Sequence, residues 1–518
     1  MLRQAKHNTR ENSTRMNEST RQQSKASSTA MRGLVFDEPL IFEMGSPGRA
    51  AYSLPKCDVP EVELEALLPA GEIRDPIENF PELTELDVVR HFTRLSQWNF
   101  SIDTNFYPLG SCTMKYNPKI NEVTAALPGF AQHHPYTPEA LSQGSLQLMF
   151  ELQEYLKEIS GMTHVSLQPA AGAHGELAGM LMVHAWHAKQ GTQRKKIILP
   201  DSAHGTNPAS AALCGYSVVQ IQSDERGLID PAKLESMMDE DTAAIMLTNP
   251  NTLGMFETDI MKITEVVHNK GGLVYCDGAN LNAVMGKTKM NAMGIDVLHF
   301  NLHKTFSTPH GGGGPGAGPV GVTDQLEPYL PIPVIEHTGG KYTLNSDRPD
   351  SVGKMKAFFG NFGILVRAYT YIRSLGPDGV KLAAEMAVLN ANYIKASLQE
   401  QYHLPYDGPS LHEAVFNDKH QLKHKVSTMD IAKMLIDYGF HPPTVYFPLI
   451  VKGALMIEPT ETESKETIDG FIEAMKDIAK RAESDPEIFH DAPYMPVASR
   501  PDETTAARSP KLRWKPGA

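Results

Sequence analysis

From about residue 140 onward, short apolar runs alternate with longer stretches in which apolar residues recur at helical spacing. Residues 140–160 show the helical period, with Leu148, Leu152 and Leu156 on one face. Short runs rich in Val, Ile and Leu are typical of strands that are buried on both faces. We expect six such strands, at 196–199, 217–222, 243–248, 273–276, 297–300 and 319–322. Strand–helix alternation predicts an α/β fold with a mainly parallel sheet.

The chain divides into segments of different texture. Residues 1–30 are rich in Ser, Thr, Asn and Gln and poor in large apolar residues, which predicts a disordered extension. Repeated prolines in residues 31–139 predict an extended arm with short helices. We expect a large domain at 140–325, a smaller C-terminal α/β domain at 326–485, and a Pro-rich tail at 486–518.

The smaller domain has its own predicted elements. Two helices are expected at 354–375 and 378–400, separated by Gly376-Pro377. Strand-like runs follow at 445–451 and 454–457, and a last helix, capped by Thr462, is expected to run to about residue 482.

The overall composition excludes several classes of protein. The chain has 48 basic and 61 acidic residues, a net charge of -13, which argues against nucleic-acid binding. No apolar run approaches the roughly 18–20 residues that span a bilayer, so we expect no membrane association. The four cysteines are widely spaced without a CxxC pair, so we expect no metal site and no disulfide framework, as in a cytosolic protein.

Two predicted strands end in residues with complementary chemistry. The run Leu273–Asn280 brings Asp277 to the end of one strand, and His299–Thr305 brings Lys304 to the end of the next. The carboxyl ends of parallel strands meet at one edge of a sheet, where ligands bind. Pyridoxal 5′-phosphate (PLP) needs both groups, a lysine for a Schiff base and a carboxylate that keeps the pyridine nitrogen protonated. We therefore predict PLP bound on Lys304.

Three further turns are candidates for the same site. Pro169–Glu176 consists mainly of small residues and opens a long helix, as expected of a phosphate-binding turn. The turn 201–208 contains His204, whose imidazole is suited to lie flat on the PLP ring, and the polar turn 248–254 is suited to contact the ring or the substrate. The Gly311–Gly316 run matches GxGxxG, but no helix follows it, so we predict a flexible loop rather than a dinucleotide site.

Four motifs together resemble one known family. They are Asn99–Pro118, Leu302–Gly316, Met456–Glu463 and Leu512–Trp514. They resemble the P-protein of the glycine cleavage system, glycine dehydrogenase (decarboxylating), and in particular subunit 2 of its split prokaryotic form. The resemblance covers residues 31–515, so residues 1–30 have no counterpart in it.

This resemblance implies a fold-type I, aspartate aminotransferase-like PLP enzyme. Its activity is the decarboxylation of glycine, followed by transfer of the aminomethyl group to the lipoyl disulfide of H-protein. The catalytic residues carried over by position are Lys304, Asp277 and His204. The 107–115 loop is expected to line the mouth of the site, without individual roles. The further cofactor contacts that the resemblance implies are Ala171, Gly172, Ala173, Asn249, Thr252 and His303.

The resemblance also implies partners. These are subunit 1, lipoylated H-protein and, indirectly, the T- and L-proteins, with two copies of each subunit in the cytoplasm of a prokaryote. Two alternatives stay open from the sequence. One is another fold-type I amino-acid decarboxylase, and the other is a non-catalytic structural subunit, against which the intact Lys304 and Asp277 argue.

Overall fold

The computed structural model describes residues 38–75, 77–311, 316–496 and 499–515. The predicted disordered extension, residues 1–30, lies outside the described residues, as do residues 312–315 of the glycine-rich loop. The chain forms two compact units, one of residues 101–493 and one that joins residues 1–100 to residues 494–518. In the part of the chain that the structure describes, no helix is long and apolar enough to cross a bilayer.

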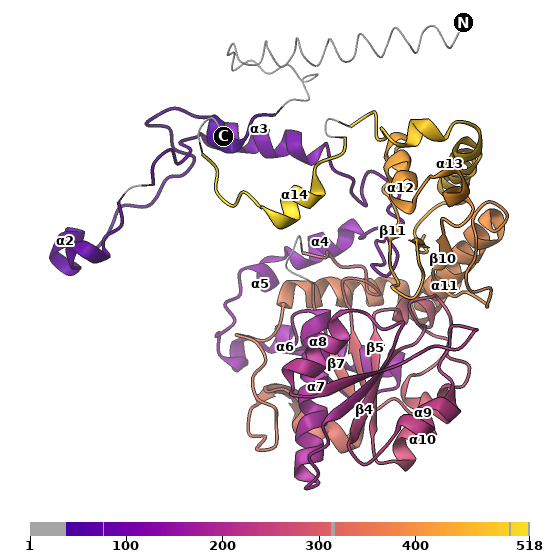
Figure 1. The fold of residues 1–518 in the computed structure, drawn as a ribbon. Coiled ribbons are helices and arrows are strands. Elements are labelled where there is room, and N and C mark those ends of the chain that lie inside the picture. The colour runs from indigo at the N-terminus through magenta and orange to yellow at the C-terminus, as the bar shows by residue number, and fades with distance from the viewer. Residues whose placement is uncertain (1–37, 76, 312–315, 497–498, 516–518) are drawn as a thin grey trace, which may run out of the picture. The chain divides into compact units, whose positions relative to one another are not determined.

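A seven-stranded sheet forms the centre of the larger unit (Figure 1). Its strand order is β1-β7-β6-β5-β4-β2-β3. Strands β2 to β6 are parallel, and β7 runs antiparallel to both of its neighbours. The predicted strands and the mainly parallel sheet are thus confirmed. The bounds are β1 (His164–Ser166), β2 (Lys196–Pro200), β3 (Ser217–Ile221), β4 (Thr242–Thr248), β5 (Leu273–Gly278), β6 (Val297–Phe300) and β7 (Val320–Val322).

Helices cover both faces of this sheet because alternate strand residues point to opposite faces and both sets are apolar. Tyr275 and Val297 pack with helix α7 (Gly172–Lys189) and helix α8 (Thr206–Leu213) on one face. Val274 and Leu298 belong to the core on the other face. The helices there are α6 (Gln143–Ser160), α9 (Pro231–Met237), α10 (Ile260–Asn269) and the first part of α11 (Phe362–Leu398).

Helix α7 lies close to the sheet through glycines on its inner face. A Cβ added at Gly179 would lie 2.6 Å from the Tyr275 ring. We therefore expect Gly179→Ala to lower the free energy of unfolding by about 1–3 kcal/mol, because a packed core accommodates an extra methyl group only with strain. Urea unfolding would measure the loss. Gly144→Ala is the matched control in helix α6, where an added Cβ meets no atom within 4 Å, and it should be neutral or stabilising.

A second, smaller sheet lies C-terminal to α11. Its order is β10-β12-β11, and it is antiparallel throughout. Helices α12 (Thr428–Asp437) and α13 (Lys465–Ser484) share one apolar core with this sheet and with the end of α11. The strands are β10 (Ala414–Asn417), β11 (Thr444–Val445) and β12 (Ala454–Ile457).

Several predicted boundaries in this region were wrong. The predicted break is present, because Gly376 has φ 64° and ψ -178° and Pro377 follows it, but the first helix begins at Phe362 rather than at residue 354. The predicted strand 445–451 is cut short because Tyr446 adopts a positive φ of 56°. Ser464, and not Thr462, caps α13.

The remaining elements are short. The larger unit also contains a hairpin of β8 (Val334–Thr338) and β9 (Lys341–Asn345), together with helices α4 (Lys119–Ala125) and α5 (Pro128–Ala131). The smaller unit contains α2 (Leu64–Leu67), α3 (Glu85–Ser96) and α14 (Glu503–Arg508). Within it, Phe42 stacks on Trp514 at a centroid distance of 5.3 Å. The predicted domain boundaries stay predictions.

Candidate active site

Asp277 lies near the end of β5, where it is almost completely buried. Its Oδ1 accepts the backbone N–H of Ala279 at 2.8 Å and lies 3.3 Å from Nε2 of His299 on β6. Burial alone would raise the pKa of this carboxyl group, but His299 and Lys304 nearby bring it below its usual value. The site therefore contains an ionised carboxylate that is shielded from water.

Lys304 lies in the turn that follows β6, where its backbone N–H bonds to the Asn301 carbonyl at 3.1 Å. Among the described residues, its ammonium makes no hydrogen bond or ion pair. Its charge nevertheless shifts the pKa values of groups from several elements, so many ionisable side chains lie near it. They are Cys112, Glu176, His204, Asp277, His299, His303, His310, His412, Glu413 and Glu458.

The predicted phosphate-binding turn ends at the N-terminus of α7. Ala171 is the N-cap, and α7 begins at Gly172, so the first backbone N–H groups, including that of Ala173, have no carbonyl within the helix to bond. Asn361 donates to the carbonyls of Ala170 and Gly316, at 3.1 and 2.5 Å, and thereby ties this turn to the loop beyond Lys304.

His303 lies beside that loop with an open ring nitrogen. Burial, and then the charge of Lys304, lower its pKa to about 3, and the same causes lower the pKa of His310 to about 4. The two rings lie 5.2 Å apart. Both imidazoles are therefore neutral. Nδ1 of His303 and Nε2 of His310 are buried without a hydrogen-bond partner among the described residues.

The three remaining predicted residues, His204, Thr252 and Asn249, differ in whether their polar atoms already have hydrogen-bond partners. Nδ1 of His204 lies 3.0 Å from the Thr206 hydroxyl, and burial lowers the pKa of His204. Thr252 donates its hydroxyl to the Ser202 carbonyl at 2.5 Å, so its proton is already engaged. Asn249 accepts the backbone N–H of Glu257 at 3.0 Å, whereas its Nδ2 is buried without a partner in the described part of the chain. Asn249 thus keeps a free donor, and Thr252 supports the turn that carries His204.

Two buried glutamates hold the 107–115 loop, which the sequence analysis expected to line the mouth of the site. The Ser111 backbone N–H donates to Glu413 and that of Thr113 to Glu458, both at 3.0 Å. Ser111 and Thr113 have positive φ values of 64° and 48°, which non-glycine residues rarely adopt. Burial raises the pKa of Glu458 to about 7 and that of Glu413 well above its usual value. The carboxyl groups thus hold Cys112, between these two residues, in a strained loop that lies near enough to Lys304 for its charge to act on the Cys112 thiol.

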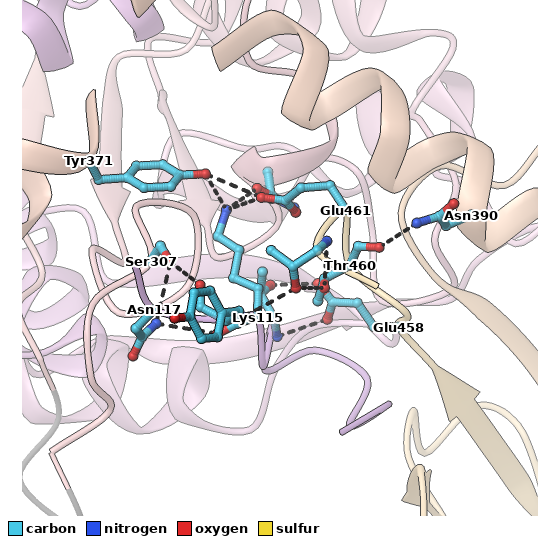
Figure 2. Close-up of polar contacts among 12 residues, drawn as sticks. Lys115, Asn117, Ser307, Tyr371, Asn390, Glu458, Thr460 and Glu461 are labelled. Carbon is cyan, nitrogen blue, oxygen red and sulfur yellow. Dashed lines mark hydrogen bonds and ion pairs between the residues drawn. The ribbon is translucent and has the colours of Figure 1, made fainter. Parts of the chain in front are cut away.

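Figure 2 shows the next contact of the same loop, at Lys115. Its ammonium is buried and bonds to Glu461 at 2.7 Å, to Asn282 at 2.9 Å and to the Tyr371 hydroxyl at 3.1 Å. Burial would lower the pKa of Lys115, but Glu461 and Tyr371 raise it above its usual value. The loop is thereby joined both to α11 and to the turn after β12.

The sequence analysis gave no role to several residues that lie near Lys304. They include His299, His310, His412, Glu413 and Glu458, whose pKa values the charge of Lys304 shifts. His299 carried a usable signal because it lies at a strand end five residues before Lys304, and Glu458 lies within the motif Met456–Glu463. His412 and Glu413 follow β9 and α11 in the chain and precede β10, so only the folded structure brings them to this sheet edge.

Comparisons with known proteins agree with this geometry. The family model described as aminotransferase class-V matches residues 174–314, and the model described as glycine dehydrogenase, C-terminal domain, matches residues 383–492. A probable glycine dehydrogenase (decarboxylating) subunit 2 from Listeria monocytogenes is 57% identical over 478 residues, which are 92% of this chain and 98% of the relative. The chain belongs to the glycine dehydrogenase (decarboxylating) subunit 2 family. A relative of the same name from Bacillus licheniformis is 56% identical over 480 residues, 92% of this chain and 99% of that one.

Solved structures confirm the fold of this subunit 2 family member. A glycine decarboxylase (P-protein) of the glycine cleavage system, in inhibitor-bound form, matches with a TM-score of 0.68 at 21% identity. The match covers 80% of this chain and 94% of that protein. A cysteine desulfurase from Escherichia coli matches with a TM-score of 0.57 at 16% identity, over 74% of this chain and 97% of that protein. The predicted family, the fold-type I α/β class and PLP dependence are confirmed.

Proposed function

We propose that this chain is the PLP-carrying subunit of a two-chain glycine decarboxylase, and that it passes the aminomethyl group of glycine to the lipoyl disulfide of H-protein. Membership of the subunit 2 family supports the reaction. The observation that carries the assignment of the site is the Lys304 ammonium in the turn after β6. It has no hydrogen bond or ion pair among the described residues, and its charge favours the ionised form of the buried Asp277 carboxyl on β5.

The side chains around Lys304 fit PLP. Nδ1 of His303, Nε2 of His310 and Nδ2 of Asn249 are buried without partners among the described residues. Leaving buried polar groups unpaired is costly, so a polar ligand is expected to satisfy them. When bound, PLP supplies an electron sink for the pair left on glycine Cα as CO2 departs.

We propose one role for each of the predicted site residues. Lys304 holds the cofactor covalently, and Asp277 keeps the proton on its pyridine nitrogen. With PLP bound, His204 would lie near the ring, while His303 and the N–H groups of Ala171, Gly172 and Ala173 would hold the phosphate at the positive end of α7. Asn249 would donate a hydrogen bond to the cofactor, and Thr252 holds the turn that carries His204.

The subunit 2 family name implies a second subunit. We propose that the enzyme contains two copies of each subunit, binds lipoylated H-protein directly, and depends on the T- and L-proteins only indirectly. We also propose that it works in the cytoplasm.

Exchange of labelled bicarbonate with glycine tests the proposed function. The chain, reconstituted with subunit 1 and PLP, should exchange label only when lipoylated H-protein is present. H-protein without its lipoyl group is the control. Absence of exchange in the complete system would refute the proposal.

Two further measurements, of methylamine release and of cofactor absorbance, test the two alternatives. A stand-alone amino-acid decarboxylase would release methylamine from glycine at full rate without H-protein. A structural subunit would bind no PLP and develop no visible absorbance when the cofactor is added.

A further inference from the structure

Three buried side chains form a polar chain that ends at Asp277. Tyr275 and Asp277 lie on the same face of β5, and His299 on β6 is the register partner of Asp277. The Tyr275 hydroxyl lies 2.6 Å from His299 Nδ1, and His299 Nε2 lies 3.3 Å from Asp277 Oδ1. At most 2% of any of the three residues is exposed, so water does not compete for these contacts.

The protonation of His299 follows from its surroundings. Burial lowers its pKa against the opposing effect of Asp277, so the imidazole is neutral and carries one N–H. When the Tyr275 hydroxyl donates to Nδ1, the hydrogen is on Nε2, the nitrogen that faces Asp277. The side-chain nitrogen of Asn301 lies 2.9 Å from the same Nε2. Exchanging the amide oxygen and nitrogen of Asn301, which have nearly the same shape, makes it a second acceptor for the Nε2 hydrogen.

Helix α7 packs closely against these side chains. A Cβ added at Gly175 would lie 3.0 Å from His299 Cβ, and one added at Gly172 would overlap the side-chain amide of Asn301. Only glycine allows the helix to pass so close at these positions. In such a dry environment, an N–H donated to a carboxylate stabilises its ionised form more than it would in water.

Other charged groups around Asp277 act in both directions. Lys304 and His204 favour its ionised form, whereas Glu176 on α7 opposes it. Burial, and then Asp277, raise the pKa of Glu176 to about 7. Thr206 donates its hydroxyl to Glu176 at 2.8 Å. Glu176 is thus partly protonated near neutral pH, which reduces the negative charge next to Asp277.

We propose that His299, held in one tautomer by Tyr275, is a positioning residue that keeps Asp277 ionised and aimed at the pyridine nitrogen of the cofactor. This inference rests on the proposed role of Asp277. His299 contacts Asp277 and acts only through it.

PLP binding to two His299 variants tests the inference. Full-length chain freed of cofactor is titrated with PLP across a range of pH, and binding is followed by visible absorbance. In His299→Leu, we expect the dissociation constant for PLP to rise about tenfold or more. The pH at which affinity is lost on acidification should also rise, because the Asp277 pKa moves up once the N–H is gone. His299→Gln keeps an amide donor and should retain most of the wild-type affinity.

Two further variants complete the experiment. Tyr275→Phe removes the hydroxyl that holds the His299 hydrogen on Nε2. It should raise the acid midpoint for PLP binding, by less than His299→Leu does. His187→Gln is the control. It changes a different buried histidine, on α7, that bonds to the Ala243 carbonyl, and it should change neither the affinity for PLP nor the acid midpoint.

Wild-type affinity and an unmoved acid midpoint in His299→Leu would overturn the inference. If His299→Leu does not fold, an unmoved midpoint in Tyr275→Phe decides against it. These readouts need no glycine. Wild-type chain that binds PLP but fails the bicarbonate exchange would therefore refute the proposed function and leave the role of His299 standing.

Discussion

Replacing Lys304 with alanine is expected to reduce glycine–bicarbonate exchange by a factor on the order of 10³ or more, because the amine that forms the covalent bond to PLP is removed. The full complex with subunit 1 and H-protein should be assayed with saturating PLP. The fold should be unaffected, since the ammonium makes no hydrogen bond or ion pair with the described residues.

Two controls separate chemistry from charge. Lys304→Arg keeps the positive charge that faces Asp277 but provides no amine for a Schiff base, so its activity should fall as far as that of the alanine variant. Lys287→Ala removes a half-exposed lysine that pairs with Glu385 on α11, and it should retain activity. Exchange by Lys304→Ala at more than about a tenth of the wild-type rate would exclude Lys304 as the cofactor lysine.

The sequence was informative where local pattern determines structure. Buried parallel strands are nearly continuous apolar runs, so β2 to β6 were predicted within one or two residues. Because strand ends meet at one sheet edge, Asp277 and Lys304 were expected to lie close together, and the charge of Lys304 does lower the pKa of Asp277. The Gly376-Pro377 break was also predictable, since both residues interrupt a helix by their own backbone constraints.

The sequence was less informative where structure depends on register or distant contacts. The apolar pattern of each strand does not predict that Asp277 lies opposite His299. That pairing depends on the register between β5 and β6. The strand predicted at 445–451 was wrong because Tyr446 turns the chain, although its neighbours are apolar. Lys115 and Glu461 both lay in recognised motifs, but 346 positions separate them, and nothing local indicates that they meet.

Removing the Glu461 carboxylate is expected to destabilise the protein strongly. Glu461→Ala should lower the free energy of unfolding by about 3–5 kcal/mol, because it leaves the ammonium of Lys115 buried without its counter-ion. The Lys115 side chain is only 1% exposed, so it cannot recover water as a partner in place (Figure 2). The midpoint of urea unfolding, measured on full-length chain, would show the loss. Glu466→Ala, at the exposed first turn of α13, is the matched control and should change stability little.

The double variant Lys115→Met/Glu461→Leu distinguishes an unpaired charge from lost packing. Met approximates the volume of the lysine stem, and neither side chain carries a charge, so the double variant should be more stable than Glu461→Ala alone. Its activity should still be lower than that of the wild type, because Lys115 and Glu461 join the strained Ser111–Thr113 loop to the turn that carries Glu458. A double variant as unstable as Glu461→Ala would show that packing at this position, and not the buried charge, accounts for the loss.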